Sequence, residues 1–152
     1  MEIIKSETKN WPAFHQIWSD SVKATHHFLK PEHFEIISGK LVSEYFPLVE
    51  LFHEEVDGQI AGFIGIDHNF ISMLFVSPLF MNRGIGSRLL EFAIKNKKAF
   101  WVDVNEQNEQ AIAFYLSKSF DIIGREEKDG LGWDYPVLHL KLSSKKIMEY
   151  EG

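Results

Sequence analysis

Residues 75–90, FVSPLFMNRGIGSRLL, constrain the fold more than any other part of the chain. They read as the end of an apolar strand, a proline, a turn with two glycines and a helix with apolar residues at helical spacing. The first N–H groups of a helix have no partner within it, and the peptide dipoles add about half a positive charge there. The segment therefore predicts a strand-to-helix turn that can hold an anion such as a phosphate. A tight connection that binds nothing is the alternative.

The two glycines of this turn would allow a phosphate group to approach the backbone closely. Gly84 and Gly86 lack a Cβ, so the backbone there can adopt unusual dihedral angles and approach a pyrophosphate closely, while Arg83 and Arg88 can add positive charge. Two other nucleotide motifs are excluded. The dinucleotide fingerprint G-x-G-x-x-G would need a glycine in place of Leu89, and the Gly-Lys-Ser/Thr of a triphosphate-binding loop is absent.

Length and composition indicate one domain with an ordinary core. The chain has 152 residues, is 45% hydrophobic and carries a net charge of −6. That charge argues against a nucleic-acid partner, because duplex binding depends on Lys and Arg that neutralise phosphates.

With no cysteine, a disulfide framework and acyl transfer through a thiolate are excluded. No apolar run approaches the roughly 20 residues of a membrane span, and no secretory signal is visible, so a cytoplasmic location without a membrane partner is expected.

The rest of the chain reads as alternating strands and helices. Strands are expected over residues 1–5, 49–56, 59–67, 70–76, 99–105, 121–127 and 135–142. Helices are expected from Asn10, from Pro31 to a point before Pro47, over residues 84–97 and over residues 108–117. The pattern predicts an α+β fold with a sheet packed on both faces, a single domain over residues 1–142, and a loosely ordered C-terminal tail over residues 143–152.

A second motif follows the glycine turn, in residues 105–120, NEQNEQAIAFYLSKSF. Together, P-x-x-x-x-R-G-x-G and N-x-x-A-x-x-F-Y-x-x-x-x-F resemble the GCN5-related N-acetyltransferases (GNAT). Residues 21–29, 103–115 and 131–140 resemble a small bacterial subfamily of these acetyltransferases. The resemblance covers the whole chain in element order, and its specific motifs occupy about residues 74–120.

The resemblance implies a three-layer α/β arrangement, with a mixed, mostly antiparallel sheet of six to seven strands, about four helices and splayed central strands. Acetyl-CoA is the implied cosubstrate and no metal is implied. The resemblance places the pantetheine arm in the gap between the splayed strands, where a backbone N–H would polarise the acetyl carbonyl, worth about 3 kcal/mol. It assigns contacts with this cosubstrate to Leu74, Phe75, Val76, Met81, Asn82, Arg83, Gly84, Ile85, Gly86, Ser87, Arg88, Asn108 and Tyr115.

Two positions depart from the family pattern. Met81 stands where the family has Arg or Gln, and Ser119 replaces the glycine before Phe120. Because backbone N–H groups make most of the phosphate contacts, cosubstrate binding is expected to survive, and Arg83 could compensate for the missing polar side chain.

Acetylation of an amine needs a base and an acid. An ammonium with a pKa near 10 is neutral in about one molecule per thousand at pH 7, and the leaving thiolate must gain a proton. The resemblance assigns the acid to Tyr115, whose alternative is a plain core tyrosine. Asn108 is expected to cap the helix that carries Tyr115.

The catalytic base is expected to be Asp103, a histidine or a chain of water molecules. Strand alternation sets Asp103 on a polar face, where it could act as base, anchor a cationic acceptor or simply be satisfied by neighbouring backbone. His26 and His27 do not share a helix face, so at most one reaches the cleft, and either could be an ordinary helix-end residue. His27 is the histidine assigned to catalysis. The remaining histidines, which show no metal-ligand spacing and are interpreted as incidental, are His15, His33, His53, His68 and His139.

The acceptor is expected to be a small-molecule or peptide amine. By resemblance, residues at the end of the first helix and between the last two strands line its site, namely His26, His27, Phe28, Trp133 and Tyr135. The aromatic rings could hold a cationic amine or cover the sheet edge. The predicted function is an N-acetyltransferase whose acceptor attacks directly in a ternary complex; a non-catalytic acyl-CoA sensor is the alternative. The oligomeric state is open, with a homodimer among the alternatives.

Overall fold

The computed structural model describes residues 2–151. Its helices are α1 (Trp11–Thr25), α2 (Pro31–Lys40), α3 (Ile85–Lys97), α4 (Glu109–Ser117) and α5 (Ser144–Glu151), with short helical turns at Thr8–Asn10, Leu41–Tyr45, Phe46–Leu48 and Pro78–Phe80. Its strands are β1 (Ile3–Lys5), β2 (Glu50–Val56), β3 (Gln59–Asp67), β4 (Phe70–Val76), β5 (Trp101–Asn105), β6 (Phe120–Glu126) and β7 (Val137–Leu142). The predicted first strand began at Met1, which lies outside the described residues.

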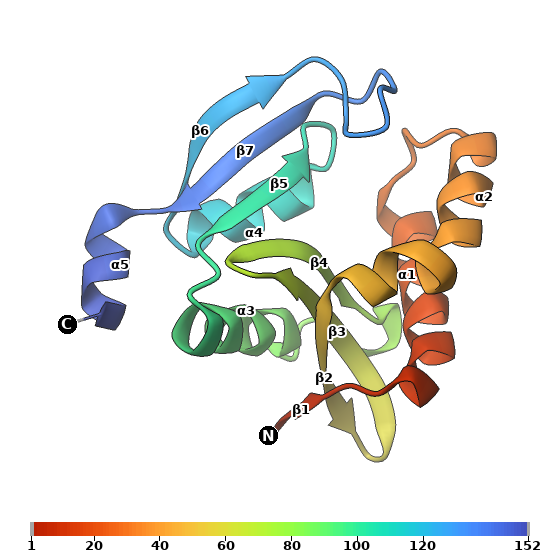
Figure 1. The fold of residues 1–152 in the computed structure, drawn as a ribbon, viewed down its shortest axis with the longest axis horizontal. Coiled ribbons are helices and arrows are strands. Elements are labelled where there is room, and N and C mark those ends of the chain that lie inside the picture. Colours follow the sequence, from red (N-terminus) through yellow and green to blue (C-terminus); the bar gives the residue numbers. More distant parts are fainter. Residues whose placement is uncertain (1, 152) are drawn as a thin grey trace.

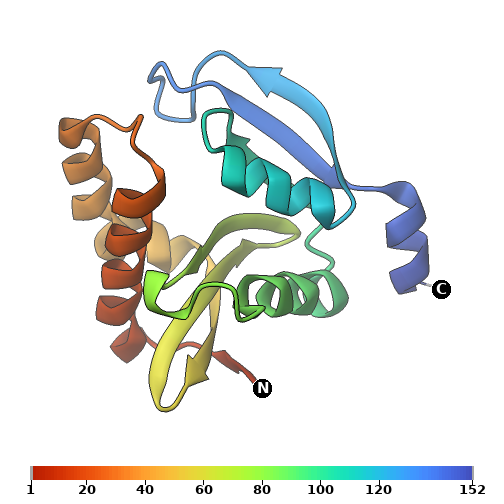
Figure 2. The same ribbon diagram turned by 180° about the vertical axis from the view of Figure 1, so that it is seen from behind.

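The strands form one sheet in the order β1-β2-β3-β4-β5-β7-β6, in which the only parallel pair among the described residues is β4 with β5. Figures 1 and 2 show α1 and α2 on one face and α3 and α4 on the other. Each face has its own core. Phe14 of α1 stacks on Phe63 with ring centroids 4.6 Å apart, whereas Leu89 and Ala93 of α3 are fully buried on the opposite face. The predicted mixed sheet with helices on both faces is confirmed.

The sheet opens between its two central strands. β4 and β5 pair only at Phe70 with Trp101 and at Ile71 with Val102. Beyond this point β4 stays paired with β3 as far as Val76, while β5 follows β7 to its end, so the two strands diverge (Figure 1). The edge of β4 that faces β5 therefore has no strand partner over residues 73–76. The splayed strands expected from the resemblance are present.

The C-terminal segment corrects one expectation. Instead of a loosely ordered tail, residues 144–151 form α5, and Ile147 and Tyr150 pack against the core that α3 also covers. The Ser143 hydroxyl accepts a hydrogen bond from the Lys146 amide at 3.2 Å, which supports the first turn. Residues 2–151 therefore contain five α-helices, where about four were expected.

None of the helices between residues 2 and 151 combines the length and the apolarity that crossing a bilayer requires.

Candidate active site

The glycine turn connects β4 to α3 and leaves the start of the helix open. Gly84 precedes the helix with φ +79°, and Asn82 also has a positive φ of +62°. No side chain caps α3, and its first intrahelical bond runs from the Arg88 amide to the Gly84 carbonyl at 3.0 Å. The amides at the start of α3 therefore have no partner within the helix and remain available to an anion.

The second glycine supplies space instead of an unusual backbone angle. Gly86 is not among the glycines with positive φ, so the expectation of unusual dihedral angles holds at Gly84 alone. A Cβ built on Gly86 would lie 3.5 Å from Val76 Cγ2 and 3.7 Å from Phe114 Cζ. The absence of a side chain at Gly86 therefore leaves space between the end of β4 and α4.

A cavity of about 370 Å³, here called the donor cavity, lies between these elements. Its lining combines the end of β4, the glycine turn, the start of α3 and one face of α4. The predicted cosubstrate residues that line it are Leu74, Phe75, Val76, Met81, Asn82, Gly84, Ile85, Gly86, Ser87, Asn108 and Tyr115. An unpaired strand edge beside a helix N-terminus fits a pantetheine arm that ends in a diphosphate. The cavity also reaches residues for which the sequence assigned no cosubstrate contact, among them Phe80 and Phe114.

The two arginines of the turn do not line the donor cavity. The Arg88 guanidinium binds both oxygens of Glu54, at 2.8 Å through Nε and 2.7 Å through Nη2, and the Glu54 side chain is fully buried. Arg83 is exposed and lies over the Phe80 ring, 5.4 Å from its centroid. Arg88 thus supports the fold through a carboxylate that sequence reasoning did not single out.

Tyr115 lies where the donor cavity meets the gap between the splayed strands. Only 5% of its surface is exposed, and its ring packs edge-on against Phe114 and Phe120. Burial raises the pKa of the Tyr115 phenol well above its usual range, so the hydroxyl keeps its proton at neutral pH. The hydroxyl has no hydrogen-bond partner among residues 2–151. It is therefore a protonated donor free to serve a group in the cleft.

A smaller cavity of about 140 Å³, here called the cleft cavity, lies between β4 and β5 and is also lined by Tyr115. Asp103 lines it from β5, and its Oδ1 lies 2.6 Å from His139 Nδ1 on β7. The Asp103 carboxylate, with a smaller contribution from Glu126, raises the pKa of the His139 imidazole. Asp103 is thus held by a histidine expected to be incidental. Finding that partner from the sequence would require knowing that β7 pairs with β5.

The two adjacent histidines have different surroundings. His26 lines the donor cavity and the cleft cavity together with Tyr115, whereas His27 is exposed and lines neither. His26 Nδ1 lies 2.7 Å from Thr25 Oγ1, and its Nε2 lies 3.4 Å from Asn108 Nδ2. The pKa of His26 is lowered mainly by burial, and to a smaller extent by repulsion from the neighbouring His27.

The aromatic residues expected at the acceptor site contact one another across two loops. The Tyr135 hydroxyl accepts a hydrogen bond from the Lys30 amide at 3.0 Å and lies 2.6 Å from His33 Nδ1. Trp133 stacks on His33 with centroids 3.8 Å apart, and Phe28 packs near Tyr135. We call Phe28, His33, Trp133 and Tyr135 the aromatic clasp. It joins the α1–α2 connection to the β6–β7 loop, which lie close together in both views (Figures 1 and 2).

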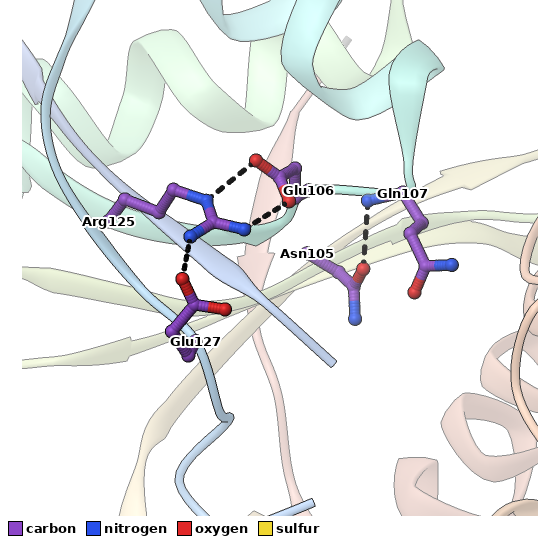
Figure 3. A network of polar contacts seen from close by, with 5 residues as sticks. All are labelled: Asn105, Glu106, Gln107, Arg125 and Glu127. Atoms are coloured by element: carbon purple, nitrogen blue, oxygen red, sulfur yellow. Dashed lines mark hydrogen bonds and ion pairs between the residues drawn. The ribbon is translucent and has the colours of Figure 1, made fainter. Parts of the chain in front are cut away.

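An ionic network braces the turn that leads into α4. Arg125 of β6 binds Glu106 through Nε at 2.8 Å and Nη2 at 3.0 Å, and binds Glu127 through Nη1 at 2.6 Å (Figure 3). Asn105 accepts a hydrogen bond from the Gln107 amide on the same turn. The turn leads to Asn108, whose Oδ1 accepts a bond from the Ala111 amide at 3.2 Å, as expected for an N-cap.

Comparisons with known proteins agree with this geometry. Residues 11–120 match the model of the acetyltransferase (GNAT) family. The chain is 37% identical over 125 residues to peptidyl-lysine N-acetyltransferase YjaB of Salmonella typhimurium, covering 82% of this chain and 86% of that protein. The solution structure of apo-form YjaB from Escherichia coli superposes with a TM-score of 0.83 at 34% identity, over 92% of this chain and 95% of that one.

A third match extends the fold comparison to a more distant protein. The crystal structure of a PaiA N-acetyltransferase from Thermoplasma acidophilum in complex with coenzyme A has a TM-score of 0.70 at 22% identity, over 92% of this chain and 98% of that one. At this identity the likeness concerns the fold. The family match and the identity to YjaB together confirm the resemblance drawn from the sequence, and the chain therefore belongs to the acetyltransferase (GNAT) family, whose acetyl donor is acetyl-CoA.

Proposed function

We propose that this protein is a peptidyl-lysine N-acetyltransferase in which the lysine amine attacks acetyl-CoA directly. One observation carries the proposal: the donor and cleft cavities bring the α3 N-terminus, the unpaired edge of β4 and the protonated Tyr115 hydroxyl into one continuous lining. The name of the relative YjaB supports the choice of a peptide lysine over a small amine.

The donor side of the reaction is a matter of binding and orientation. Acetyl-CoA supplies a thioester whose acyl carbon accepts the amine. The amides at the start of α3 and the turn around Gly84 would hold its diphosphate, and residues 74–76 of β4 would pair with the arm as an added strand. An N–H on this edge would stabilise negative charge that develops on the acyl oxygen.

Two side chains in the cleft cavity have separate tasks. Tyr115 donates its proton to the leaving sulfur, and because burial raises the pKa of the phenol, that proton is present throughout the neutral range. Asp103, at the opposite side of the cleft, attracts the cationic lysine, and His139 holds its carboxylate in place. The aromatic clasp would define the rim over which the peptide enters.

The test combines a lysine peptide with a blocked N-terminus, acetyl-CoA and the wild-type protein. We expect CoA release and, by mass spectrometry, one acetyl group on the lysine side chain. Replacing the lysine by arginine should abolish the reaction. Tyr115→Phe should lower kcat by roughly 10² to 10⁴-fold, the usual contribution of a general acid, and leave the calorimetric affinity for acetyl-CoA unchanged.

Two results would contradict the proposal. Turnover of small amines without turnover of any lysine peptide would exclude the peptide acceptor. Binding of acetyl-CoA without turnover of any amine would favour the acyl-CoA sensor.

A further inference from the structure

We infer that His26 is the base that removes the proton from the acceptor ammonium. The inference rests on the proposed function and assigns the group that makes a lysine reactive at neutral pH. It differs from the sequence-based assignment of this task to His27.

His26 lies where three cavities meet. A third cavity of about 340 Å³, here called the α1–α2 cavity, is lined by Val22, Lys23, His26, His27, Leu29, Pro31, Phe34 and Glu35. Of the residues lining these three cavities, His26 is the only one common to all of them. One imidazole therefore borders the donor cavity and the cleft cavity, where the amine must lose a proton, and also a separate cavity between α1 and α2.

The hydrogen bonds of His26 fix its tautomer. The Thr25 hydroxyl donates to the Ser21 carbonyl at 2.8 Å, so its oxygen is left to accept a bond from His26 Nδ1–H at 2.7 Å. On the other side of the ring, Asn108 uses Oδ1 to accept from the Ala111 amide, which turns its NH₂ group toward His26 Nε2. The lone pair of the imidazole is therefore on Nε2.

The contact between Asn108 and His26 is weak enough to be exchanged. Its length of 3.4 Å is well above the usual 2.9 to 3.0 Å of an N–H donor bond. An ammonium in the cleft is a stronger donor than a neutral amide and can replace Asn108 at Nε2. A proton acceptor is thus held ready toward the cleft from which the lysine would attack.

The electrostatic surroundings keep the ring neutral before the reaction. Desolvation is the largest effect that lowers its pKa below the ordinary value of 6.5, followed by repulsion from His27. Lys23 and Glu35 line the α1–α2 cavity with it, and Asp103 and Tyr115 line the cleft cavity with it. The carbonyl groups at the end of α1 act in the opposite direction, because a helix C-terminus favours a cation.

The protons balance over one turnover. His26 Nε2 takes one proton from the ammonium, after which the amine nitrogen forms the new C–N bond and the C–S bond breaks. The Tyr115 hydroxyl gives its proton to the departing sulfur, and the second proton of the amine nitrogen restores the phenol. The imidazolium then releases its proton to water, so the enzyme returns to its starting state.

The experiment compares the wild-type protein with His26→Gln on two acceptors, a lysine peptide with a blocked N-terminus and a lysine-free peptide with a free α-amino group. Near pH 7 the variant should lose roughly 10² to 10⁴-fold in kcat/KM with the lysine peptide. The loss should shrink as the pH approaches about 10 and be smaller with the α-amino acceptor, whose pKa is about 8 and which deprotonates without help. A merely structural role would lower the rate equally at every pH.

Two further measurements do not depend on turnover. In the wild type, an NMR titration should give His26 a pKa below 6.5, and calorimetry should show the same acetyl-CoA affinity for wild type and variant. His68→Asn, a change of an exposed histidine on the β3–β4 turn, serves as the control and should behave as wild type.

Several outcomes would overturn the inference. A pH-independent loss in His26→Gln, no loss at all, or a pH-dependent loss in His27→Gln alone would each exclude His26 as the base while leaving the proposed function intact. A wild-type protein that binds acetyl-CoA but acetylates no amine would instead remove the proposed function, and this inference with it.

Discussion

His139 and Asp103 face each other as direct partners on β7 and β5, with Nδ1 of the imidazole 2.6 Å from Oδ1 of the carboxylate. Gly124 on β6 makes room for the imidazole, since a Cβ there would lie 3.2 Å from His139 Cδ2. Glu126 approaches the other ring nitrogen at 3.4 Å. Three adjacent strands thus orient the one carboxylate that lines the cleft cavity from β5.

The first prediction concerns the titration of this pair. Because Asp103 accepts a hydrogen bond from the imidazolium, the pKa of His139 should lie above 6.5 in the folded protein and fall in Asp103→Asn. A raised folded-state pKa stabilises the protein fully below pH 6.5, and this contribution is lost as the pH rises through the folded value. NMR titration measures the pKa, and denaturation on both sides of this window measures the stability, which should change by under about 1 kcal/mol for a partly exposed pair.

One outcome of the NMR titration would contradict this prediction. If the pKa of His139 is the same in wild type and Asp103→Asn, the carboxylate is not its main partner in solution.

The second prediction concerns Gly86. Valine at this position would project its side chain between Val76 and Phe114, inside the donor cavity. We expect acetyl-CoA to bind at least about tenfold more weakly, which corresponds to about 1.4 kcal/mol. Gly39→Val is the matched control, because it places the same residue in a helix where a Cβ meets nothing within 4 Å. Calorimetry should show a defect in Gly86→Val alone; equal affinities would mean that the arm lies elsewhere.

Local sequence patterns predicted the part of the site that is local in the chain. Residues 75–90 contain their own strand, turn and helix start, so the positive φ of Gly84 and the uncapped start of α3 follow from glycine and helix physics. The Asn108 cap likewise depends on three consecutive peptide units. Topology supplied the rest. The pairing of His139 with Asp103 requires two strands to be adjacent, and the cavities that distinguish His26 from His27 depend on how the end of α1 lies against α4.

The C-terminal helix shows the same limit. Residues 144–151 are mostly polar and too short to form a stable helix alone. Their helix is explained by Ile147 and Tyr150, which reach the core. Such tertiary stabilisation leaves only a weak local signal in the sequence.

The third prediction concerns Arg88 and Glu54. Arg88→Ala would leave the fully buried Glu54 carboxylate without its bidentate partner. Removing one member of a buried pair costs about 3 kcal/mol or more, so we expect a large fall in the free energy of unfolding. Acetyl-CoA affinity, measured below the melting transition, should change little, because Arg88 does not line the donor cavity.

A variant on the same helix provides the control for Arg88. Lys95→Ala removes an exposed pair with Glu91 one turn away and should leave the stability nearly unchanged. A large loss of acetyl-CoA affinity in Arg88→Ala with normal stability would show instead that the guanidinium leaves Glu54 to bind phosphate.

The fourth prediction concerns the aromatic clasp, which should act on the acceptor and not on the donor. Tyr135→Phe removes the hydroxyl that accepts a hydrogen bond from the Lys30 amide and contacts His33, at a cost of about 1 kcal/mol for the lost hydrogen bond. The two loops should then separate more readily, raising KM for the lysine peptide while the affinity for acetyl-CoA stays constant. Tyr45→Phe is the control, since that hydroxyl has no hydrogen-bond partner among residues 2–151. If both variants leave KM unchanged, the clasp only covers the sheet edge, because a rim that guides the peptide must respond to the loss of the bond that closes it.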